Sequence, residues 1–179
     1  MTGIESLESV FRLHGLTDFK WIQPKAIVVA QWVRMKCRYG CPQYGRIASC
    51  PPNTPTVEEC RRFFDDYRTA VVFHFQKTAP DSDVRRAWSA KTNIGLSTLE
   101  RDVFLAGYHK AFVLFMDSCH ICAECPPSRA DCKEAKLSRP SPEGMAVDVY
   151  TTVRQLGYPI KVLTDPSQEM NRYAFLMVE

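Results

Sequence analysis

The spacing of the cysteines constrains this chain more than any other feature. Cys119, Cys122 and Cys125 are separated by two residues each, and Cys132 follows after six more. Cysteines at such intervals on a turning loop point their sulfur atoms into one small volume, as a metal ion or an iron–sulfur cluster requires. We therefore expect the loop at 119–132 to carry a metal centre.

Two kinds of metal centre fit these four thiols. Three cysteines at gaps of two residues are typical of ferredoxin-type [4Fe–4S] sites, although there the fourth cysteine follows after three residues and precedes a proline. Tetrahedral zinc also takes four thiolates, but its sites usually consist of two Cys-x-x-Cys pairs separated by a longer loop. The spacing favours the cluster, with Cys132 as the fourth ligand and with His120 beside the ligands or facing solvent.

A second group, Cys37, Cys41 and Cys50, lies in a Gly- and Pro-rich segment at 37–52. Its three thiols can hold a cluster with one open iron, or zinc completed by a histidine or by Cys60. The two groups can also face one another and share a site. Burial of thiols for packing alone is less favoured in a loop of this composition. The gaps differ from the Cys-x-x-x-Cys-x-x-Cys motif of radical enzymes that cleave S-adenosylmethionine.

Three further features have both a functional and a structural interpretation. Cys60 falls on the apolar stripe of an amphipathic helix, where a cysteine usually packs as a small hydrophobic residue. His74 lies in an apolar strand and is expected to be a hydrogen-bonded core histidine. Basic residues surround the first cysteine group, and they form a solvated rim, offset a cluster's negative charge, or bind an acidic redox partner; they are Arg34, Lys36, Arg38 and Arg46.

The composition is that of a single globular domain over residues 1–179, with 45% hydrophobic and 24% charged residues. The net charge of +3 is too small to favour nucleic-acid binding. The N-terminus lacks the basic and apolar segments of a signal peptide, and the apolar runs are too short to cross a bilayer. We expect a cytoplasmic protein without a membrane partner, whose eight cysteines bind metal rather than form disulfides.

Hydrophobic periodicity predicts alternating strands and helices. Expected strands cover 25–35, 70–76, 109–116, 160–164 and 172–178, and the last two form a hairpin around a turn at 165–171. Expected helices cover 4–15, 81–89, 96–107 and 141–157, with an interruption at 91–95, and another begins near Pro55 with capping-box spacing of Thr56 and Glu59. The predicted class is α/β or α+β, with a central mixed sheet of about five strands, packed helices and two cysteine loops fed by strand ends.

Four segments, taken in order from Val33 to Gly157, resemble the predicted metal-binding proteins of domain of unknown function 2284, a family found mainly in anaerobic bacteria and archaea: VRMKCRYGCPQYGRIASCPP, FLAGYHKAF, CHICAECPPSRADC and RPSPEGMAVDVYTTVRQLG. Cys60 lies outside the cysteine motifs of that family. The resemblance implies cysteine-bound metal, in iron–sulfur form, at Cys37, Cys41, Cys50, Cys119, Cys122, Cys125 and Cys132.

Three functional hypotheses follow from these patterns. The first is an iron–sulfur protein with one [4Fe–4S] cluster or two, in an electron-transfer or accessory redox role with a redox protein partner. The second is a structural-zinc module that binds another protein, and the third is an enzyme whose first cysteine group holds a cluster with an open iron. No phosphate-binding glycine loop, Gly-x-Ser-x-Gly or His-Glu-x-x-His motif points to another reaction. The sequence does not indicate a substrate, catalytic residues or an oligomeric state.

Overall fold

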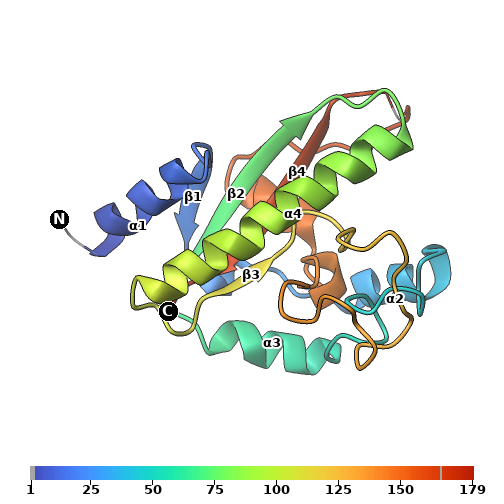
Figure 1. Cartoon of the computed structure of the whole chain (residues 1–179), viewed down its shortest axis with the longest axis horizontal. Helices are drawn as coiled ribbons and strands as arrows, with labels where there is room; N and C mark the ends of the chain where they lie inside the picture. The colour runs from blue at the N-terminus through green and yellow to red at the C-terminus, as the bar shows by residue number, and fades with distance from the viewer. Residues whose placement is uncertain (1–2, 166) are drawn as a thin grey trace.

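The computed structural model describes residues 3–165 and 167–179. In chain order the elements are α1 (Gly3–Leu13), β1 (Phe19–Ile22), the 3-10 turn η1 (Pro24–Ala26), α2 (Gln31–Gly40), α3 (Val57–Asp65), β2 (Ala70–Lys77), α4 (Ser82–Leu105), β3 (Phe112–Leu114), the 3-10 turn η2 (Glu143–Met145), α5 (Val149–Gln155) and β4 (Met170–Met177). Figure 1 shows the sheet with α4 lying along it, and α2 at the same end of the molecule as the long loop that follows β3.

The strands form an antiparallel sheet in the order β1-β2-β4-β3. The two central strands pair from Ala70 opposite Met177 to Lys77 opposite Met170. The α+β class is therefore confirmed. The expected mixed sheet of about five strands is wrong in two respects, because every pair of adjacent strands in the described sheet is antiparallel and the sheet has four strands.

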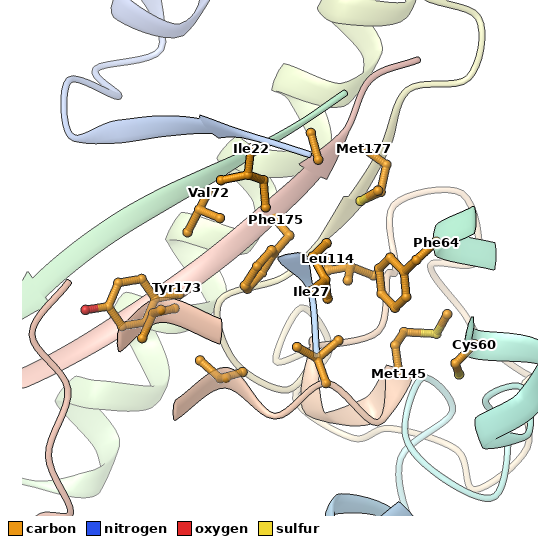
Figure 2. Close-up of a cluster of buried hydrophobic side chains, with 14 of the residues drawn as sticks. Ile22, Ile27, Cys60, Phe64, Val72, Leu114, Met145, Tyr173, Phe175 and Met177 are labelled. Atoms are coloured by element: carbon orange, nitrogen blue, oxygen red, sulfur yellow. The ribbon is translucent and has the colours of Figure 1, made fainter. Parts of the chain in front are cut away.

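Both faces of the sheet are covered, because side chains of a strand alternate between faces. Ala174 and Leu176 of β4 pack with residues of α1 and α4, whereas Tyr173, Phe175 and Met177 pack with residues of α3 and α5. Figure 2 shows part of the second cluster, in which Cys60 projects from α3. Cys60 is fully buried, so the prediction that it packs as a core residue is confirmed.

The strand expected at 25–35 is wrong. Residues 24–26 form η1, Val29 makes a single bridge to Val147, and the helix α2 begins at Gln31. The alternation of Val29, Gln31 and Val33 is typical of a strand. From Gln31, however, the backbone forms the hydrogen bonds of a helix, in which only Val33 is buried. Cys37 therefore lies on a helix instead of following a strand.

Several other element boundaries differ from expectation. The helix α4 runs unbroken from its Asp81 cap, so the interruption at 91–95 is wrong. The helix at 141–157 is split into η2 and α5 by Ala146, whose φ of 60° is left-handed. Residues 160–164 form no strand, and β4 pairs with β2 and β3 instead. The predicted hairpin around 165–171 is therefore wrong, and Pro166 within that segment lies outside the described residues. The strand at 109–116 shortens to β3.

Other predictions are confirmed. The helix at 4–15 corresponds to α1, and the strands at 70–76 and 172–178 correspond to β2 and β4. Thr56 caps α3 in a complete capping box with Glu59, which satisfies backbone amides that would otherwise lack a partner. Among the described helices, none has the length and apolar character needed to span a membrane.

Candidate metal centre

The helix α2 places two cysteines of the first group one turn apart. Cys37 lies in the last turn, and Cys41 caps the helix with an extended backbone. Residues four positions apart lie on the same side of a helix, so the gap of three residues between these cysteines has a direct geometric meaning. The wrong strand prediction had concealed this relation.

Cys50 joins these two thiols at one cavity. The Cys50 amide donates a hydrogen bond to the Ile47 carbonyl, and the Gly45 amide donates one to the Pro51 carbonyl, so the loop folds back on itself. Cys37, Cys41 and Cys50 then line the same cavity, whose volume is about 340 Å³. Charged side chains share its wall, and sequence reasoning did not find them: Asp117, Glu143 and Arg172.

The four cysteines of the second group also lie near one another. Burial raises the pKa of the Cys122 thiol, and the nearby Cys119, Cys125 and Cys132 raise it further. Cys119 is buried, whereas the other three are half-buried. Cys122 and His120 face a hollow of about 410 Å³ beside α4. Burial lowers the pKa of His120, which favours its neutral form.

The two cysteine groups are adjacent. The Ala48 amide of the first loop donates a hydrogen bond of 3.4 Å to the Cys125 Sγ of the second loop. The Asn53 Nδ2 group donates one of 2.7 Å to the Pro127 carbonyl. Burial raises the pKa of Cys50 to about 12, and Cys37, Cys41, Cys119 and Cys125 contribute to that increase in this order. The interpretation in which the groups face one another therefore agrees with their placement.

A polar stripe along α4 holds the second cysteine loop. Its members recur at intervals of three or four residues, the spacing of one helix face. Each contacts the segment from 117 to 139: Arg86 the Ala123 carbonyl, Ser89 the Asp117 carboxylate, Asn93 the Ser118 carbonyl, Ser97 the Leu137 carbonyl, and Glu100 the Arg139 guanidinium. Asn93 is fully buried, which explains why the polar segment at 91–95 does not end the helix. The spacing of these polar residues in the sequence already follows one helix face, but the segment at 91–95 was interpreted as an interruption of the helix.

The basic residues near the first group differ in role. Arg34 is not part of a solvated rim, because its guanidinium donates to the Pro55 carbonyl at 2.9 Å and the Gly144 carbonyl at 3.0 Å. Lys36, Arg38 and Arg46 are exposed. Only these three therefore remain available for a charged partner at the surface.

His74 has the structural role expected of it. Its ring nitrogens contact the Asp18 carboxylate at 2.6 Å and the Asn171 side chain at 2.7 Å. The ring also stacks on Tyr173. The prediction of a hydrogen-bonded histidine is confirmed.

The thiols of the first group line a cavity instead of meeting at a point. Among residues 3–165 and 167–179, no three His, Cys, Asp or Glu side chains form a group that could hold a metal ion as they stand. The donor set is nonetheless rich in sulfur, which suits iron–sulfur clusters and zinc. A cluster takes its protein ligands at separate irons, so the three thiols around the first cavity fit its chemistry.

The buried ion pair between Glu100 and Arg139 generates a first prediction. The Glu100 carboxylate also accepts the Val113 amide hydrogen at 2.7 Å, so it links α4, β3 and the end of the second cysteine loop. Glu100→Gln should lower the free energy of unfolding by about 3 kcal/mol, since Arg139 loses its counter-charge. Urea unfolding followed by circular dichroism measures this. Glu169→Gln, at an exposed carboxylate, is the matched control, and equal stability of the two variants would contradict the assignment.

The raised pKa of Cys50 generates a second prediction. Iodoacetamide reacts with thiolates, and at neutral pH the Cys50 thiol of the metal-free protein stays protonated. It should react at least about tenfold more slowly than the exposed Cys41, and faster as the pH rises toward its pKa. Mass spectrometry of labelled peptides measures both rates. In urea the difference should vanish; equal rates in the folded protein would refute the burial argument.

Comparison with known proteins agrees with the sulfur-rich site. Searches of curated proteins and of solved structures found no match. One family model, described as predicted metal-binding protein (DUF2284), matches residues 20–178, a range that contains both cysteine groups and nearly the whole fold. This chain therefore belongs to the DUF2284 family of predicted metal-binding proteins.

Proposed function

We propose that this protein is an iron–sulfur protein that binds a [4Fe–4S] cluster at Cys119, Cys122, Cys125 and Cys132 and takes part in electron transfer. The observation that supports the proposal is the placement of these four cysteines on one loop, with Cys122 close enough to the other three for them to raise its pKa. Four thiolates on one loop are the usual ligand set of such a cluster.

Two features of the surroundings support a cluster in the second loop. The Ala48 amide donates to the Cys125 sulfur, and hydrogen bonds to ligand sulfur are a means by which proteins tune cluster potentials. The stripe on α4 fixes the loop from Asp117 to Arg139, which positions the ligands before the metal binds.

A second centre at Cys37, Cys41 and Cys50 extends the proposal. These thiols share a cavity whose lining contains none of the second group's cysteines, so two adjacent centres fit better than one shared centre. Adjacent centres suit the passage of electrons between a surface and a buried site. Cys41 is exposed, and Lys36, Arg38 and Arg46 lie exposed near it in the sequence, so an acidic redox protein is the expected partner.

Metal analysis after anaerobic purification tests the proposal. We expect a brown protein with roughly four irons and four sulfides per cluster. Cys122→Ser should lose the iron of the second loop and keep the rest. Cys60→Ala is the matched control, because Cys60 lies in the core, and it should keep all iron while losing some stability. A colourless protein with stoichiometric zinc would show that the second hypothesis, a structural-zinc module, is correct instead.

A further inference from the structure

We propose that Glu143 is the fourth ligand of the metal centre at Cys37, Cys41 and Cys50, through one oxygen of its carboxylate. The inference rests on the proposed function, because it assumes a cluster in the first group. It concerns the coordination position that three thiols leave open.

The position of Glu143 follows from the way η2 is attached to α2. The Arg34 guanidinium donates a hydrogen bond of 3.0 Å to the Gly144 carbonyl. Arg34 and Cys37 lie three positions apart on α2, so they face the same side of the helix. This hydrogen bond holds Gly144 against α2, so the preceding residue, Glu143, lies beside Cys37. In agreement with this placement, the charge of Glu143 contributes to the raised pKa of the Cys37 thiol.

Glu143 also shares its surroundings with the thiols. It lines the cavity that Cys37, Cys41 and Cys50 line. With Cys37 and Cys41 it also lines an adjoining groove of about 840 Å³, which opens on the side of Trp32 and Val162. Glu143 is exposed where it lines these two hollows, which is the placement that a ligand to a bound group needs.

The hydrogen bonds of η2 leave the carboxylate available and oriented. The Ser141 hydroxyl oxygen accepts the Gly144 amide hydrogen at 3.1 Å, so its own hydrogen is free to bond the Glu143 carboxylate. None of the ion pairs found among the described residues involves Glu143. The Glu143 carboxylate also accepts a hydrogen bond from its own backbone amide, and with these two partners it retains lone pairs that can bind iron.

The other carboxylate of the cavity is already occupied. One oxygen of Asp117 accepts the Ser118 amide hydrogen at 2.9 Å, and the second accepts the Ser89 hydroxyl hydrogen at 3.2 Å. Asp117 therefore holds the second cysteine loop on α4, whereas Glu143 faces the cavity. Because Asp117 positions the second cysteine loop, the control for the loss of a carboxylate is Glu169→Gln, at an exposed residue that does not line the cavity.

An oxygen ligand has a chemical consequence that a fourth thiolate does not have. Carboxylate is a harder donor than thiolate and suits iron in a sulfur cluster less well. The iron at Glu143 should therefore exchange more readily than the irons held by cysteine. Glu143 also lines the groove beside Trp32, so this groove leads to the proposed ligand.

Release of iron during mild oxidation tests the inference. Anaerobically purified protein is treated with ferricyanide, and a ferrous chelator counts the iron released. The wild type should release one iron of the first centre well before the others. Glu143→Cys should retain that iron, since thiolate replaces oxygen, and Glu143→Gln should be purified without it or lose it severalfold faster. Glu169→Gln should release iron as the wild type does.

The outcomes separate this inference from the proposed function. Identical iron release by the wild type, Glu143→Cys and Glu143→Gln, with iron and sulfide present, would overturn the ligand role of Glu143 and leave the iron–sulfur function standing. Zinc in place of iron in the wild type would overturn the proposed function itself. Thermal unfolding of each variant, followed by circular dichroism, shows whether a loss of iron reflects a loss of fold. Electron paramagnetic resonance of the reduced Glu143→Cys protein gives a second readout of the changed ligand.

Discussion

The cysteine loops contain little regular structure, so their backbone polar groups need partners both in local turns and in side chains from other elements. Three attachments meet this requirement. The polar stripe of α4 binds the second loop, Asn53 joins the first loop to the Pro127 carbonyl, and Arg34 ties η2 to α2. Without these contacts, buried carbonyl groups would lack partners at a cost of about 1–3 kcal/mol each. The sites therefore depend on polar contacts, while the sheet and its two apolar clusters form the support.

This construction places thiols where they resist ionisation. Burial and the neighbouring sulfur atoms raise the pKa of Cys50 to about 12, and burial also raises the pKa of Cys37. A metal must therefore displace protons in order to bind, and its affinity should increase with pH. In the metal-free state the protonated thiols behave as small apolar groups. Cys37 and Cys50 are thus neutral thiols without metal and would become thiolates on binding it.

The sequence indicated membership of a metal-binding family, but it did not predict the geometry of the candidate site. Cysteine spacing is local, so Cys119, Cys122 and Cys125 already indicated a loop around a common centre. The adjacency of Ala48 and Cys125 depends on chain segments far apart in the sequence, and no local pattern reports it. The sequence did not indicate Glu143 as a site residue, because Glu143 was predicted to lie in a regular helix. In the structure the left-handed Ala146 ends η2 and separates it from α5.

Similar reasons account for the fold. Strong apolar strands such as β2 were predicted because both of their faces are buried, and the capping box of Thr56 is a local signal. The alternation at Val29–Val33 was misread because strand and helix patterns are difficult to distinguish over so few residues. Strand order depended on long-range pairing of β4 with β2 and β3, which periodicity does not encode.

Anomalous diffraction at the iron edge from anaerobically grown crystals would test the central claim most directly. The account predicts iron at two places on either side of the contact between the Ala48 amide and the Cys125 sulfur: one bounded by Cys119, Cys122, Cys125 and Cys132, the other by Cys37, Cys41 and Cys50. Iron at neither place, with the cysteines holding zinc or paired as disulfides, would contradict it.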